Sequence, residues 1–157
     1  MPNWCENYLI VKASPEIINN MEEAIKNENL FETFVPILEN IKNKVTDDVE
    51  NWCIENWGTK WDICDPEILR KEVLDTNNAV IIVKFNTAWN PPITFYENLN
   101  EKVYEIEAYY AEYGMSIFGK YKDGNTEEYE ENEIPDDFWK YIQKLDDNEN
   151  NCDEEDK

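Results

Sequence analysis

The stretch Ala-Val-Ile-Ile-Val at residues 79–83 limits the possible folds more than any other feature of this chain. It is continuously apolar and rich in β-branched residues, which is typical of a central, buried strand. A second strand pattern at 69–74 precedes it. The Asp-Thr-Asn-Asn sequence between them suits a hairpin turn, because Asn tolerates the left-handed backbone region. The Asn-Pro-Pro sequence at 90–92 ends the strand. These residues predict a hairpin at the centre of a sheet.

Helical and strand patterns alternate along the rest of the chain. A strand is expected at 8–12, and a helix from the cap pair Ser14-Pro15 to about Lys26. Further expected elements are an apolar connection at 30–38, a short helix within 39–50, a helix at 92–104, strands at 105–113 and 115–122, an edge strand at 126–131 and a last helix at 134–145. The order β-α-insert-β-β-α-β predicts an α+β fold of the ferredoxin-like, split βαβ kind. In such a fold an antiparallel-dominated sheet carries helices on one face.

Tryptophan is concentrated in the insert. Residues 52–62 read Trp-Cys-Ile-Glu-Asn-Trp-Gly-Thr-Lys-Trp-Asp, and the N-terminus repeats their Trp-Cys and Glu-Asn order at residues 4–7. Because Gly58 and the nearby Pro66 interrupt a helical pattern, an ordered loop is expected at 52–62.

Three long motifs in this order resemble the YubB-type ferredoxin-like proteins of phages and conjugative plasmids. They are Met-Pro-Asn-Trp-Cys-Glu-Asn at 1–7, the sequence at 52–62, and Phe-Asn-Thr-Ala-Trp-Asn-Pro-Pro at 85–92; Tyr-Gly-Met-Ser-Ile-Phe-Gly at 113–119 also fits. The resemblance covers about residues 1–122. It implies a ferredoxin-like fold and a mobile-element origin, and it brings no catalytic residue. Residues 123–145 are then an acidic strand and helix extension, and 146–157 a disordered acidic tail.

The charge of the chain is strongly negative and uneven. Its 36 acidic and 14 basic residues give −22, and residues 123–157 hold 15 acidic against 3 basic residues, a net −12. Direct nucleic-acid binding is not expected, because Lys and Arg supply most of the affinity for phosphates. A basic protein partner is favoured, in particular a nucleic-acid-handling defence effector. Solubility alone is the competing explanation of the charge.

Mimicry of a nucleic-acid backbone by surface carboxylates is therefore the leading hypothesis. The chain would be an anti-defence inhibitor, anti-CRISPR or similar, and a solvated tail without function is the alternative. The acidic residues expected to bind the partner are Glu127, Glu128, Glu130, Glu131, Glu133, Asp136 and Asp137.

The second hypothesis is an aromatic pocket for a small molecule such as a nucleotide signal. Tryptophans with a few polar groups are the usual lining of such a site. The candidate residues are Trp4, Asn7, Trp52, Glu55, Asn56, Trp57, Lys60, Trp61 and Trp89. The alternative is structural: the tryptophans clamp the insert onto the sheet, and backbone carbonyls satisfy their indole N–H groups.

Catalysis, metal binding and a cofactor are not expected. The chain has no histidine, and its four cysteines include no closely spaced pair. A Cys–His pair or a Ser-His-Asp triad is excluded for the same reason. The carboxylates of Glu6 and Glu55 form a conceivable acid pair, but hydrogen bonds to loop amides explain them equally well. The cysteines are expected to be buried, reduced thiols.

Location follows from the same sequence. No apolar run approaches 18 residues, and no basic segment precedes an apolar one at the N-terminus. The expected location is the cytoplasm of a bacterial host.

Overall fold

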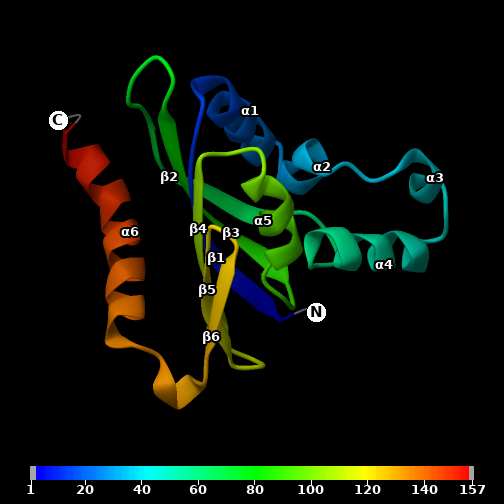
Figure 1. Ribbon diagram of the computed structural model, residues 1–157. Helices are drawn as coiled ribbons and strands as arrows, with labels where there is room; N and C mark the ends of the chain where they lie inside the picture. The colour runs from blue at the N-terminus through cyan, green and yellow to red at the C-terminus, as the bar shows by residue number, and fades with distance from the viewer. Residues whose placement is uncertain (1–2, 156–157) are drawn as a thin grey trace.

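The computed structural model describes residues 3–155, with side chains as far as residue 147 (Figure 1). The fold is α+β. Its strands are β1 (Trp4–Ala13), β2 (Cys64–Val73), β3 (Ala79–Ala88), β4 (Glu105–Glu112), β5 (Ile117–Lys122) and β6 (Asn125–Tyr129). Its helices are α1 (Pro15–Lys26), α2 (Leu30–Phe34), α3 (Glu39–Lys42), α4 (Thr46–Trp57), α5 (Ile93–Asn100), the single 3-10 turn η1 (Glu131–Glu133) and α6 (Asp136–Glu155).

The strands form one open sheet in the order β2-β3-β1-β4-β5-β6, and every neighbouring pair is antiparallel. The sheet is therefore antiparallel throughout, whereas the sequence predicts one that is antiparallel-dominated. β3, which carries the 79–83 stretch, lies between β1 and β2, and β2 and β6 form the two edges.

The first face of the sheet packs under α1 and α5. Along β1 the side chains of Leu9 and Val11 point into this core, together with Phe31 of α2 and Phe95 of α5. The helix α1 begins as its sequence predicts: Pro15 stands at the first helical position, and the Ser14 hydroxyl accepts a hydrogen bond from the Ile17 N–H.

The tryptophan-rich insert is more regular than the sequence analysis predicts. Residues 52–57 are not a loop but the second half of α4. Val49, Trp52, Cys53 and Trp57 lie at helical spacing and pack on the core, so a helical face is buried there. Gly58, at φ +90°, ends α4 in the left-handed conformation, so of the predicted stretch 52–62 only residues 58–62 form a loop.

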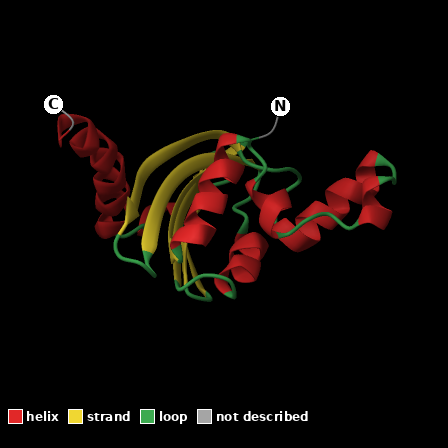
Figure 2. Ribbon diagram, turned by 90° about the horizontal axis from the view of Figure 1, so that it is seen from above, coloured by secondary structure: helices red, strands yellow, loops and turns green. Residues whose placement is uncertain are grey.

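α6 covers the opposite face of the sheet, which corrects the expectation that helices occupy one face. Figure 2 shows α6 on one side of the sheet and the other helices on the other. Phe138 and Leu145 of α6 pack with Tyr8 and Tyr109 in a second core. The reason is that the second face also carries buried apolar side chains, and these need a cover.

The backbone of α6 is helical as far as Glu155, whereas the composition predicts a helix ending near Leu145 and disorder from 146. Near the start of this stretch, the Tyr8 hydroxyl donates a hydrogen bond to the Asp146 carboxylate at 3.2 Å, which fixes the helix to β1. Residues 156–157 of the predicted tail lie outside the described residues.

One row of paired residues crosses all six strands on the second face. In strand order it consists of Glu67, Lys84, Tyr8, Tyr109, Lys120 and Glu127. The Lys84 ammonium lies 5.4 Å from the Tyr8 ring centre, and Lys120 lies 3.8 Å from the Glu127 carboxylate. This row combines aromatic side chains in the middle with an ion pair toward the β6 edge.

None of the helices among residues 3–155 has the length and apolar character to cross a membrane.

Candidate functional site

The structure separates the candidate tryptophans into an inner and an outer group. Trp57 belongs to the inner group: it is 3% exposed, and its indole N–H donates to the Val35 carbonyl at 2.8 Å. Its ring lies edge-on to Trp52 at 5.9 Å and tilted against Phe31 at 5.6 Å. Both inner tryptophans therefore hold α4 against the core.

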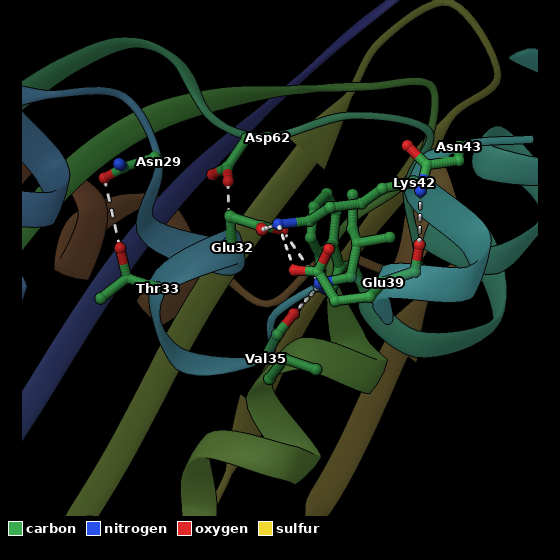
Figure 3. Close-up of polar contacts among 10 residues, drawn as sticks. Asn29, Glu32, Thr33, Val35, Glu39, Lys42, Asn43 and Asp62 are labelled. Atoms are coloured by element: carbon green, nitrogen blue, oxygen red, sulfur yellow. Dashed lines mark hydrogen bonds and ion pairs between the residues drawn. The ribbon is translucent and has the colours of Figure 1, made fainter.

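The loop 58–62 is held by hydrogen bonds to two different parts of the fold, the end of β3 and the start of α2. The Thr59 hydroxyl donates to the Ala88 carbonyl at 2.8 Å, at the end of β3. The Asp62 carboxylate accepts from the Glu32 N–H at 2.9 Å (Figure 3). It also accepts from the Phe31 N–H at 3.0 Å and so caps α2. Burial raises the pKa of Asp62, although these backbone bonds lower it.

Glu32 continues this network toward α3. Its carboxylate accepts from the Ile37 N–H at 2.9 Å and pairs with the Lys42 ammonium at 2.8 Å (Figure 3). The network fixes the chain between α2 and α3, which is a structural task.

Asn7 lies in a buried polar network beneath the loop. Its amide donates to the Thr87 hydroxyl at 2.9 Å and to the Cys5 carbonyl at 3.0 Å. Thr87 donates in turn to the Asn90 carbonyl at 2.7 Å, and the Tyr96 hydroxyl donates to Asn7 at 3.4 Å. Asn7, Thr87 and Tyr96 are all 0% exposed. These partners satisfy Asn7 inside the protein, so its amide is not available to a ligand.

Buried thiols lie in the same region. Burial raises the pKa of Cys5 to about 12 and that of Cys53 to about 11. At neutral pH both are protonated, and a protonated thiol is a poor nucleophile. Among residues 3–147, no group of three Cys, Asp or Glu side chains is placed to hold a metal ion.

The outer group lies on the surface where β1 begins and β3 ends. Trp4 and Trp61 are 37% and 38% exposed, with their rings edge-to-face at 6.4 Å. The Lys60 ammonium lies 6.0 Å from the Trp89 ring centre. Trp89 has φ +69°, a conformation that is strained for a bulky residue. These four residues form an aromatic and cationic surface cluster.

Two candidate pocket residues lie apart from both groups, on α4. The Glu55 side chain is exposed. The Asn56 carbonyl accepts from the Asn98 amide at 3.1 Å and ties α4 to α5. The nine candidates are therefore spread over the core, the surface cluster and α4 and do not line one pocket. Four surface hollows of the described residues are lined by other side chains.

The predicted acidic residues follow one another along β6, η1 and the start of α6, and on β6 the neighbours Glu127 and Glu128 face opposite sides of the sheet. We call this set the acidic ridge: Glu127, Glu128, Glu130, Glu131, Glu133, Asp136 and Asp137. All seven side chains are exposed. Among the ion pairs of the described residues, Glu127 with Lys120 is the one that involves the ridge. The ridge therefore presents mostly unneutralised charge to solvent.

An exposed aromatic patch adjoins the ridge, and sequence reasoning missed it. Tyr113, Met115 and Trp139 are 59%, 66% and 38% exposed, and Tyr113 stacks on Trp139 at 6.5 Å and 14°. The Ser116 hydroxyl, in the same turn, donates to the ridge residue Glu131 at 3.1 Å. The sequence did contain a sign of this patch. Tyr113 and Met115 flank Gly114 in a turn, where apolar side chains have no core to enter.

No family model, curated protein or solved structure matches this chain. The likeness to the YubB-type proteins thus rests on the motif residues alone.

Proposed function

We propose that this chain is a non-enzymatic protein-binding inhibitor, encoded by a phage or other mobile element, that acts on a nucleic-acid-handling defence complex in the bacterial cytoplasm. The observation that carries the proposal is the acidic ridge: seven exposed carboxylates, six of them outside any ion pair of the described residues. A basic groove built for phosphates is the complementary surface.

The aromatic patch supports a protein rather than a small molecule as the partner. Protein interfaces combine aromatic anchors with a polar rim, and Tyr and Trp are enriched among the residues that contribute most to binding. Here Tyr113 and Trp139 stand at the side of the ridge, where Ser116 contacts Glu131. The carboxylates then steer the encounter, and the rings bury apolar area in the complex.

The topology supports the ferredoxin-like part of the proposal. In a split βαβ fold the first strands of the two βα units lie side by side at the sheet centre. Here these strands are β1, followed by α1, and β3, followed by α5, and they are direct neighbours. β5, β6 and α6 are additions beyond β4, and the ridge lies on them.

The test is a capture experiment from host lysate at low salt with three forms of the full chain. The first is the wild type. The second neutralises four ridge residues, as Glu130→Gln, Glu131→Gln, Glu133→Gln and Asp136→Asn. The matched control neutralises four exposed glutamates on the helices α1, α3, α4 and α5, one on each. These changes are Glu23→Gln, Glu39→Gln, Glu55→Gln and Glu97→Gln.

We expect the wild type and the control to retain a basic nucleic-acid-binding protein that a salt step releases, and the ridge variant to lose it. The purified partner should also lose its nucleic acid when the chain is added. Equal capture by the ridge variant, or capture unchanged between low and high salt, would contradict the proposal.

The outer tryptophan cluster favours a second candidate, the binding of a nucleotide-like ligand. Trp4 and Trp61 expose ring faces, and Lys60 supplies a cation beside Trp89. Trp57 is buried, so its replacement would unfold the core; Trp61→Ala is the informative change. This candidate predicts that a nucleotide quenches tryptophan fluorescence in the wild type and in the ridge variant but not in the Trp61 variant.

A further inference from the structure

A hollow of about 330 Å³ lies on the second face of the sheet between α6 and strands β4 to β6. Four aromatic side chains form its walls: Tyr109 of β4, Tyr129 of β6, and Phe138 and Tyr141 of α6. Its volume lies within the range of pockets that hold small groups. Phe138 is 3% exposed and Tyr109 6%, so the walls are fixed by packing.

The ring planes of these four side chains are inclined to one another, so they surround the hollow from several directions. Tyr109 and Tyr141 are 4.8 Å apart at 36°, and Tyr109 and Phe138 are 5.7 Å apart at 58°. Tyr129 meets Phe138 nearly edge-on, at 5.8 Å and 76°. Ring faces attract cations, because the aromatic quadrupole places negative charge there.

Carboxylates surround the rings. Glu127 and Asp137 line the hollow, and the Tyr129 hydroxyl donates to Glu127 at 2.9 Å. The Tyr109 hydroxyl donates to Glu107, at the border with the adjoining hollow, at 2.5 Å. Burial and the neighbouring Glu127 raise the pKa of Tyr129 to about 12, so this phenol remains neutral at physiological pH.

One cation of the chain itself already stands in the hollow. Lys120 of β5 lines it between Tyr109 and Glu127 in the cross-strand row, and its ammonium lies 3.8 Å from the Glu127 carboxylate. With Lys120 present, the lining still holds two carboxylates against one ammonium. One negative charge of the lining is therefore left without a counter-charge from Lys120.

We propose that this hollow receives an arginine side chain of the basic protein partner. A guanidinium is planar and weakly hydrated, so it stacks on aromatic rings and pairs with carboxylates at the same time. Phosphates and other anions are excluded by the carboxylates. The inference rests on the proposed function, since Glu127 and Asp137 belong to the acidic ridge, and it adds the side chain that the ridge recognises.

The probe is N-acetylarginine amide, titrated to millimolar concentration into the full chain and followed by NMR of labelled tyrosine rings. Its neutral counterpart, N-acetylcitrulline amide, has nearly the same shape. We expect saturable shifts of Tyr129 and Tyr141 with arginine and none with citrulline. Equal shifts with citrulline would overturn the proposal, since the charge would then be irrelevant.

Neighbouring residues on β6 supply a matched pair of variants. Glu127 lies in the hollow, whereas Glu128 pairs with Gly119 and faces the other side of the sheet. Both are exposed, and either Glu→Gln change removes one charge. We expect Glu127→Gln to weaken arginine binding about tenfold and Glu128→Gln to leave it unchanged. Equal losses in the two variants would mean general attraction to an acidic surface, and the assigned site would be wrong.

The four ridge residues neutralised in the capture experiment do not line the hollow, so the two proposals fail separately. Lost capture without arginine binding overturns only the arginine site. Arginine binding with capture unaffected by the ridge variant overturns the proposed function and leaves the site.

Discussion

At the scale of single residues, two glycines share a backbone conformation but differ in their surroundings. Gly58 has φ +90° and Gly124 φ +97°. A Cβ at Gly58 would lie 3.2 Å from both the Ile93 nitrogen and the Pro91 oxygen, whereas at Gly124 the nearest atom is 4.0 Å away. The pair therefore separates backbone strain from crowding.

We expect Gly124→Ala to lower the free energy of unfolding by about 1 kcal/mol, the cost of a left-handed residue with a side chain. Gly58→Ala should cost clearly more, because the loop 58–62 must also move from α5. Urea unfolding of both variants measures this difference. Equal losses would show that the contact between Gly58 and residues 91–93 is loose.

The two buried cysteines lead to a prediction about reactivity. Cys5 and Cys53 are 0% and 2% exposed, and their pKa values are raised to about 12 and about 11. We expect iodoacetamide at pH 8 to leave both unmodified in the native protein and to modify both in urea. The half-buried Cys64 is the internal control. Rapid native modification of Cys5 would contradict the described burial.

The raised pKa of Cys5 makes the free energy of unfolding depend on pH. Burial raises the pKa of Cys5 from 9.0 to about 12, so the unfolded chain loses this proton first as the pH rises. The stabilisation is complete below pH 9 and is lost as the pH approaches about 12. Between pH 8 and pH 10.5, the wild type should therefore lose more unfolding free energy than Cys5→Ala. Parallel losses in urea titrations would refute this sign.

At the scale of elements, α6 is the least expected part of the fold. Phe138 packs between Tyr109, Tyr129 and Trp139 at ring distances of 5.7, 5.8 and 4.9 Å. We expect Phe138→Ala to cost about 3 kcal/mol of unfolding free energy through the cavity that it leaves. Lys140→Ala, an exposed change on the same helix, should stay within about 0.5 kcal/mol. Thermal and urea unfolding compare the two, and a neutral Phe138→Ala would mean that α6 does not pack on the sheet.

The elements also show how far the sequence could lead. Strand patterns and turn residues were sufficient for the antiparallel sheet, because β-branched runs and Asn-rich turns act locally. The face that α6 covers depends on where the sheet has apolar side chains without a cover, and the sequence of the helix itself does not show this. Two local signs were present: Tyr8, Leu9, Ile10 and Val11 of β1 are all apolar, and so is the run 79–83 of β3, which is the pattern of strands covered on both faces.

The candidate site was harder to predict for a related reason. Trp57 and Trp61 stand four residues apart in one motif, yet Trp57 is 3% and Trp61 38% exposed. Gly58 separates them by ending α4, so the chain changes direction between the two rings. Because the two residues are close in sequence, the motif indicated a single pocket. In the fold, Trp57 packs in the core and Trp61 belongs to the surface cluster. The exposure of the acidic ridge was easier to predict, since runs of charged side chains stay in water.

At the scale of the whole molecule, the net charge of −22 opposes folding through self-repulsion. Salt screens that repulsion over about 8–10 Å at physiological strength. Raising NaCl from 10 to 300 mM should therefore stabilise the protein on the order of 1 kcal/mol, about 3 °C in Tm for a chain of this length. The four-residue ridge variant should gain less. A Tm that falls with salt would mean that attractive ion pairs outweigh the repulsion.

The cross-strand row on the second face has a consequence for how copies of this chain meet. Its two ends are Glu67 on β2 and Glu127 on β6, the edge strands of the open sheet. Two sheets that approach edge to edge with these row ends facing each other bring carboxylate against carboxylate. Charged side chains on edge strands are a known safeguard against edge-to-edge aggregation. These charges thus act against edge-to-edge association of the open sheet at high protein concentration.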